Sequence, residues 1–247
     1  MLHQPVKDLP QKLDGIKGPR ISHSLREILT PLELARLSIF WWRLPTRHRG
    51  FGKPVILLPG FGAGEQSMIV IREYLRFLGY RPFDWGLGRN GGEVEEMLEN
   101  FSEILAARHD EVGEPVALVG WSLGGVVARE AARDNPDAVS QVVTLGTPLI
   151  GGPQYTAPGP FLYSRAEREE IEAKVSDRYA VPLDLPVTSI YSKKDGIVAW
   201  QASVDHWSPD VENIEVDTTH FGFGFSEQVL TLIAEILGGH RPRPSNP

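Results

Sequence analysis

The sequence predicts an α/β protein in which a mostly parallel sheet is covered by helices on both faces. Short apolar runs of four or five residues, each consistent with a buried strand, alternate with segments of helical periodicity. These runs are apolar at nearly every position, which is typical of strands buried on both sides. The length of 247 residues suits one large domain of this class or two small ones.

Composition excludes several classes of protein. The net charge is −7 and the basic residues are scattered, so no nucleic-acid partner is expected. There are no cysteines, which excludes disulfides and thiolate metal sites. The first residues contain no apolar core of a secretory signal, and no run approaches the roughly 20 apolar residues of a membrane span. A cytoplasmic location is therefore expected.

The first 50 residues are expected to form an N-terminal arm and an apolar helix outside the main domain. Residues 1–24 are polar and lack a core of their own. Thr30 is expected to cap a helix and to form a capping box with Glu33. The helix over 31–44 carries apolar residues on more than one face, so we expect it to pack on the body of the protein. The alternative is peripheral membrane contact through residues 31–49, where arginines follow an aromatic end.

The main domain is expected to occupy residues 51–240. Its strands are predicted from apolar runs, and its helices from apolar positions spaced three or four residues apart. In chain order the pattern predicts strands at 55–58, 116–119, 142–145, 187–191 and 213–216, and helices at 66–78, 93–108, 123–133 and 226–237.

One segment interrupts this alternation. Residues 149–186 lie between two predicted strands and are too long for a plain connection. Their first part is rich in glycine and proline, and a second capping box, Ser164 with Glu167, opens a charged helix that ends near Tyr179. We expect this insert to act as a cap or lid over a binding site rather than as a surface excursion. Residues 241–247 form a polar tail.

A sharp turn between a strand and a helix is predicted at Ser122. Gly120 and Gly124 stand two residues before and after it, which fits the G-x-S-x-G pattern in its strand–turn–helix context. Such a turn strains the backbone of the central residue and pushes its side chain outward. Glycine at both flanking positions avoids a clash where the neighbouring segments approach. Ser122 is therefore the candidate nucleophile.

A serine hydroxyl is a weak nucleophile, so it needs a base, and the base needs an acid that orients it. In folds with this turn the acid and the histidine follow the serine in that order, each after a later strand. Asp195 comes just past the strand at 187–191, and His220 follows the strand at 213–216. The sequence therefore predicts Ser122, Asp195 and His220 as a catalytic triad.

Other residues compete for the roles of base and acid. His206 is the main rival for the base, although a surface position is the favoured interpretation, and His240 lies in the polar tail. For the acid, Asp184 precedes a strand rather than following one. Asp217 stands so close to His220 in the sequence that a well-directed hydrogen bond between them is disfavoured.

Acyl transfer also requires N–H donors for the oxyanion that develops at the carbonyl. One is expected from the backbone of Leu123, directly after the nucleophile. The second is expected from the glycine-rich loop after the first strand, with Phe61 first and Gly62 next. A dinucleotide site in this loop is disfavoured, because Glu65 and Ser67 stand where a third glycine is required and no Walker lysine follows.

Together these segments resemble an α/β-hydrolase, and within that group the bacterial lipase and esterase type. The resemblance rests on VILLPGFGAG, LVGWSLGG, VVTLGTP, SKKDGIV and DTTHFGFG, and it covers about residues 55–238. It implies the α/β-hydrolase fold, here with an N-terminal helical extension and a small cap or lid insert. Lipases of this type often carry His-Gly where this chain has Pro59-Gly60, so the details of their oxyanion loop are not carried over. The absence of a signal and of cysteine favours a carboxylesterase over a secreted lipase.

The resulting hypothesis is a serine hydrolase that cleaves carboxylic esters through an acyl-enzyme, with a small-molecule ester or lipid as substrate. No metal and no organic cofactor are expected. An acyltransferase, an amidase or a cofactor-free perhydrolase would use the same triad, and a non-catalytic ligand-binding protein would share the fold. Neither the acyl chain length nor the oligomeric state follows from the sequence.

Overall fold

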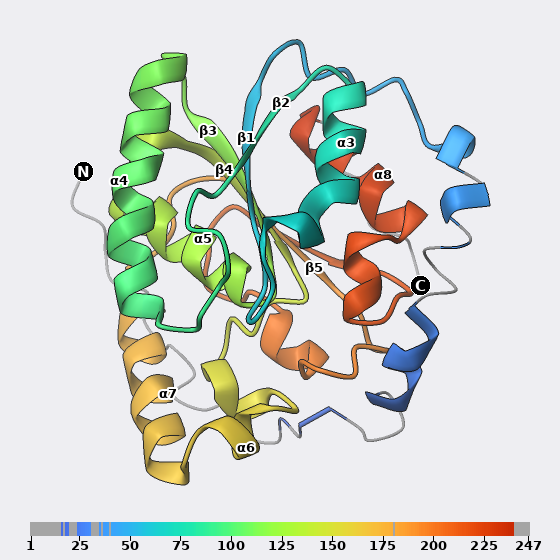
Figure 1. Cartoon of the computed structure of the whole chain (residues 1–247). Helices are drawn as coiled ribbons and strands as arrows, with labels where there is room; N and C mark the ends of the chain where they lie inside the picture. The colour runs from blue at the N-terminus through green and yellow to red at the C-terminus, as the bar shows by residue number, and fades with distance from the viewer. Residues whose placement is uncertain are drawn as a thin grey trace.

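A six-stranded sheet forms the centre of the computed structural model, which describes residues 16, 18–19, 24–30, 35, 37–39, 41–179 and 181–239 (Figure 1). All neighbouring strands run parallel, in the order β2-β1-β3-β4-β5-β6. The predicted fold class is therefore confirmed. The strands are β1 (Pro54–Leu58), β2 (Arg81–Asp84), β3 (Val116–Trp121), β4 (Val139–Leu145), β5 (Val187–Tyr191) and β6 (Val211–Glu215).

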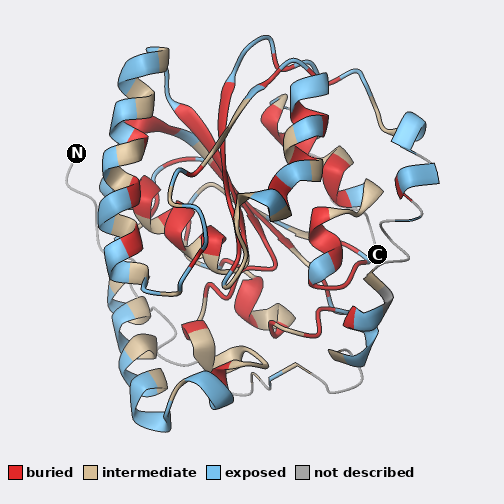
Figure 2. Ribbon diagram, in the orientation of Figure 1, coloured by how far each residue is buried: buried red, intermediate tan, exposed pale blue. Residues whose placement is uncertain are grey.

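Helices cover both faces of the sheet because its strands are apolar on both sides. Along β1, Val55 and Leu57 pack with α3 (Ile69–Phe77) and α8 (Glu227–Leu237). The alternate residues of the same strand pack with α4 (Val94–Val112) and α5 (Leu123–Asp134) on the other face. Figure 2 shows the resulting buried layer along the central strands. The sheet thus holds the ends of its strands in fixed positions, where the candidate site residues lie.

Strand β2 was not predicted, because its sequence is short and contains a proline. It forms one edge of the sheet and pairs only with β1 among the described strands. Pro82 is tolerated there, since one side of an edge strand has no ladder partner and proline lacks the N–H donor. All but one of its residues are partly buried, unlike the residues of β1.

The expected capping box of Thr30 with Glu33 stays a prediction, because Glu33 lies outside the described residues. Thr30 directly follows the helical turn η1 (Leu25–Leu29) and is itself helical. Its hydroxyl donates a hydrogen bond to the carbonyl oxygen of Glu27 at 2.7 Å. A threonine hydroxyl can bind a carbonyl oxygen of the preceding turn in this way as well as accept an N–H group.

The expected packing of the segment over 31–44 is only partly correct. Residues 31–34, 36 and 40 lie outside the described residues, so the helix is not described over its whole length. Leu37 is buried in the core beside α3 and α8. The indoles of Trp41 and Trp42 are 60% and 68% exposed, because they stand on the separate turn η2 (Trp41–Arg43), which buries no residue. The aromatic end of the segment is therefore a surface feature.

The insert between β4 and β5 folds into three short elements. They are η5 (Gly152–Tyr155), α6 (Gly159–Leu162) and α7 (Arg165–Tyr179). The capping box that opens α7 is confirmed: Ser164 N–H donates to the Glu167 carboxylate at 2.7 Å, and Glu167 N–H donates to the Ser164 hydroxyl at 3.3 Å. In the described parts of the chain, no helix combines the length and the apolar character needed to cross a membrane.

Candidate active site

The turn at Ser122 joins β3 to α5 and is strained. Ser122 has φ of 54° and ψ of −123°, a backbone conformation that residues other than glycine rarely adopt. A Cβ at Gly120 would lie 2.4 Å from Cα of Gly125, and a Cβ at Gly124 would lie 2.4 Å from the carbonyl oxygen of Leu58. Only glycine fits at either position, so the turn can bring Ser122 to the edge of the sheet.

The candidate acid and base lie in contact with each other. Asp195 follows β5 and His220 follows β6, and both side chains are buried. Oδ2 of Asp195 lies 2.7 Å from Nδ1 of His220. Oδ1 of Asp195 accepts the N–H groups of Ile197 at 2.8 Å and Val198 at 2.7 Å. The carboxyl group is therefore held by its own loop, and it fixes the Nδ1 edge of the imidazole ring.

The acid and base loops are also tied to each other by residues that the sequence did not single out. Ser192 donates its hydroxyl to the carbonyl oxygen of Thr218 at 2.6 Å and accepts the N–H of Lys194 at 3.0 Å. The carboxyl group of Glu27, from η1, accepts backbone N–H groups of both loops. No sequence signal marked either residue, because serine and glutamate are common in polar segments and these partners are distant along the chain.

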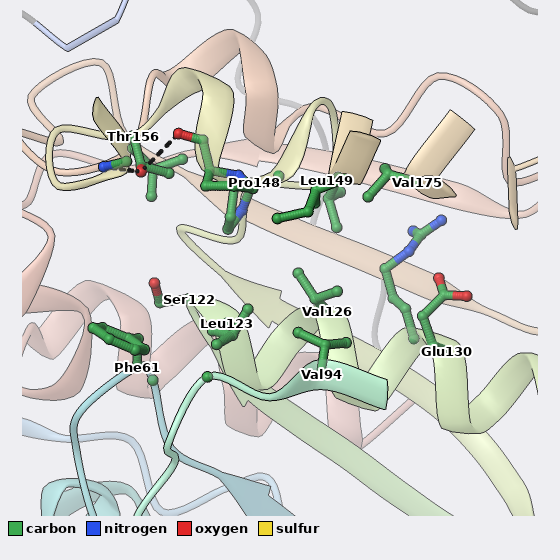
Figure 3. Close-up of a pocket in the computed structure, with 18 of the residues that line it drawn as sticks. Phe61, Val94, Ser122, Leu123, Val126, Glu130, Pro148, Leu149, Thr156 and Val175 are labelled. Atoms are coloured by element: carbon green, nitrogen blue, oxygen red, sulfur yellow. Dashed lines mark hydrogen bonds between the residues drawn. The ribbon is translucent and has the colours of Figure 1, made fainter. Parts of the chain in front are cut away.

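The structure places Ser122 and His220 on the wall of one cavity with a volume of about 1490 Å³. The opposite wall includes residues of the insert, among them Thr156 and Val175 (Figure 3). Figure 3 shows the Ser122 side chain directed into this space, with Glu130 at the far end. Most labelled lining residues are apolar and come from both walls: Phe61, Val94, Leu123, Val126, Pro148, Leu149 and Val175.

Backbone donors for an oxyanion lie next to Ser122. Leu123 is the first residue of α5, where N–H groups have no acceptor within the helix. Phe61 and Leu123 both line the cavity. The N–H of Gly62 donates to the carbonyl oxygen of Asn90 at 2.8 Å, so it is not available for a substrate. Of the two candidates in the glycine-rich loop, Phe61 is therefore the better placed.

The rival residues lie elsewhere. His206 is exposed and packs edge-on against Trp207, with ring centroids 5.8 Å apart, and it does not line the cavity. Asp217 is exposed and forms an ion pair with Lys194. Asp184 is exposed as well. His240 lies outside the described residues.

Charged residues gather at the end of the cavity far from Ser122. Arg178 of α7 binds the carboxylate of Glu130 and, at 2.9 Å, that of Asp134 on α5. Burial alone would raise the pKa of Glu130, but Arg133 and Arg178 outweigh it and hold that pKa below its ordinary value. These ion pairs connect the insert to the domain and leave the space near Ser122 apolar.

The sequence matches the model of a known family. The model of the alpha/beta hydrolase family matches residues 55–235. A pimeloyl-[acyl-carrier protein] methyl ester esterase from Aliivibrio salmonicida is 32% identical over 110 residues, which cover 44% of this chain and 40% of that protein. A mitochondrial palmitoyl-protein thioesterase, ABHD10 from Bos taurus, is 25% identical over 189 residues, 64% of this chain and 62% of its own. The matches therefore span less than two thirds of these relatives.

Solved structures show the same fold. The mature lipase BlEst2 of Bacillus licheniformis has a TM-score of 0.61 at 13% identity, covering 78% of this chain and 95% of the lipase. Alpha/beta hydrolase domain-containing protein 10 from mouse has a TM-score of 0.53 at 22% identity, covering 77% and 90%. At such identities the likeness concerns the fold alone.

Proposed function

The chain belongs to the alpha/beta hydrolase family, and from this premise we propose that it is a serine hydrolase that cleaves carboxylic esters. One observation carries the proposal. Ser122, on a strained turn, and His220, paired with buried Asp195, line the same cavity, whose wall near the serine is apolar. The two relatives are named as an esterase and a thioesterase, which supports acyl transfer from an oxygen or sulfur leaving group.

Each proposed residue has a defined part in the reaction. Ser122 Oγ attacks the carbonyl carbon while Nε2 of His220 takes its proton. Asp195 holds Nδ1 protonated and stabilises the imidazolium that forms. The N–H groups of Phe61 and Leu123 bind the oxyanion. His220 then gives its proton to the leaving alcohol, and a water activated by the same ring releases the acid from the acyl-enzyme.

The size of the cavity favours a large apolar acyl group. Its volume of about 1490 Å³ exceeds the roughly 300–1,000 Å³ of an ordinary small-ligand pocket. Each methylene buried on the apolar wall contributes about 0.8 kcal/mol, which corresponds to about a fourfold gain in kcat/KM. We therefore expect kcat/KM to rise along a series of p-nitrophenyl esters from acetate to palmitate, and a maximum at acetate would contradict this part of the proposal.

The test of the reaction itself is labelling of the nucleophile. A fluorophosphonate probe should label the wild-type chain at Ser122 and leave Ser122→Ala unlabelled, with p-nitrophenyl ester hydrolysis lower by about 10⁴-fold or more. The melting temperature should be nearly unchanged, since Ser122 is only partly buried. A Ser122→Ala variant that keeps activity within about tenfold of wild type would overturn the proposal.

The remaining enzymatic alternatives differ from an esterase in the acyl acceptor or in the bond that is cleaved. An acyltransferase, an amidase or a perhydrolase would also label at Ser122, so product analysis with added alcohol, amide substrate or peroxide separates them. A non-catalytic ligand-binding protein would not label. A cytoplasmic location and the absence of a nucleic-acid partner stay predictions from the sequence.

We further propose that residues 31–49 make peripheral membrane contact. The exposed indoles of Trp41 and Trp42 support it, together with the neighbouring arginines. The double variant Trp41→Ala, Trp42→Ala should keep the melting temperature and lose sedimentation with anionic liposomes. Phe77→Ala, which removes a 56% exposed aromatic on α3, is the control and should sediment as wild type does. Equal sedimentation of both variants would refute the contact.

A further inference from the structure

One buried side chain of the N-terminal segment lies beside the loops of the candidate active site. Glu27 lies in η1, which precedes the main domain, and it is only 8% exposed. Figure 1 shows η1, in blue, beside the red C-terminal part of the chain, which carries the His220 loop. A buried carboxyl group needs hydrogen-bond donors, and the position of these donors shows what Glu27 does.

All three donors are backbone N–H groups next to the proposed acid and base. Oε1 of Glu27 accepts the N–H of His220 at 2.8 Å and that of Gly196 at 2.9 Å. Oε2 accepts the N–H of Phe221 at 3.0 Å. Gly196 directly follows Asp195, so a single carboxyl group spans the loop of the acid and the loop of the base.

Two neighbours of Glu27 bind the same loops. The hydroxyl of Ser24 donates to the carbonyl oxygen of Gly196 at 2.7 Å. The hydroxyl of Thr30 lies 3.2 Å from that of Thr219, the residue before His220. One helical turn therefore contacts both loops at three side chains, and Glu27 is the one that bridges them.

We propose that Glu27 is a positioning residue, which fixes the separation of Asp195 and His220 for the reaction proposed above. The inference rests on that reaction. If Glu27 served only to anchor the N-terminal segment, a hydrogen bond to any polar group of the main domain would be sufficient. Here the bound groups include the backbone N–H of the base itself, so loss of the carboxyl group would free the segment that carries the imidazole. A displacement of about 1 Å in a catalytic group can cost about 10²-fold in rate.

The inference predicts a graded loss of kcat with little change in KM, because Glu27 does not line the cavity. Glu27→Gln keeps one acceptor oxygen and turns an NH2 group toward an N–H donor, so kcat should fall about tenfold. Glu27→Ala removes all three bonds, so kcat should fall about a hundredfold. Amide hydrogen exchange should be faster at Gly196, His220 and Phe221 in Glu27→Ala, and mainly at Phe221 in Glu27→Gln, whose remaining oxygen can still accept the other two N–H groups.

Asn213→Ala is the matched control. Asn213 on β6 also makes two hydrogen bonds to the backbone of another loop, accepting from Asp205 N–H and donating to Asp205 C=O, both at 2.8 Å. The variant should lower the melting temperature without lowering kcat, at a temperature where every variant is folded. If Glu27→Ala fails to fold, the Glu27→Gln result decides.

Two outcomes would overturn the inference. One is a kcat of both Glu27 variants within about twofold of wild type. The other is unchanged hydrogen exchange in the two loops. If the proposed reaction itself were wrong, the Ser122→Ala variant would remain active. Amide hydrogen exchange in the Glu27 variants would still report whether the two loops are held.

Discussion

Substitution of Asp195 by asparagine tests the proposed acid, because it keeps the shape of the side chain and changes only its hydrogen bonding. Oδ1 accepts two backbone N–H groups, from Ile197 and Val198. An NH2 group at that position would face two donors, so in Asp195→Asn the amide oxygen must occupy the position of Oδ1. The NH2 group then occupies the position of Oδ2, 2.7 Å from Nδ1 of His220.

The consequence is the wrong tautomer of the base. An NH2 group donates to Nδ1, which must then be unprotonated, so the ring proton moves to Nε2. Nε2 is the nitrogen that has to accept the proton of Ser122. In a triad of this kind the change lowers turnover about 10⁴-fold, or about 5 kcal/mol in activation free energy. Stability should change little, because the two backbone bonds persist.

The measurement is kcat and KM for a p-nitrophenyl ester, together with the melting temperature. We expect kcat to fall by three to four orders of magnitude with KM nearly constant. Asp217→Asn is the control, since Asp217 is exposed and pairs with Lys194. The reasoning is refuted if Asp195→Asn stays within about tenfold of wild type, or if Asp217→Asn loses as much activity.

Three further predictions follow from the same structure. His220→Ala should lower kcat about as much as loss of the nucleophile, whereas exposed His206→Ala should stay near wild type; the reverse result would make His206 the base. Gly124→Ala should give unfolded or inactive protein, because the added Cβ would meet a β1 carbonyl oxygen at 2.4 Å; a folded variant with normal kcat would contradict the steric argument. Asp205→Asn should lower the free energy of unfolding by about 3–5 kcal/mol, since it removes the carboxylate partner of buried Arg129; urea unfolding measures it, and a change near zero would count against a structural role of this pair.

The central sheet was predictable from the sequence because its strands are buried on both faces. A continuous apolar run is visible without knowledge of the neighbouring strands, and five of the strands were predicted with boundaries within three residues of those observed. The edge strand β2 was not, since an edge strand needs neither a long apolar run nor a full set of N–H donors. The exposure of Trp41 and Trp42 also contradicted the expectation from composition, because burial depends on what lies opposite a side chain.

The sequence by itself determined the turn at Ser122 and the order of the proposed acid and base. The G-x-S-x-G pattern between a strand and a helix marks the turn within a few residues of sequence, and loop positions after parallel strands are set by chain order. Only the tertiary structure decided that the insert faces the serine across a cavity and that Glu27 spans the two loops. Glu27 lies 169 positions from Gly196 and 193 from His220 along the chain. Contacts at such separations follow from the packing of the whole chain, and no local pattern of residues records them.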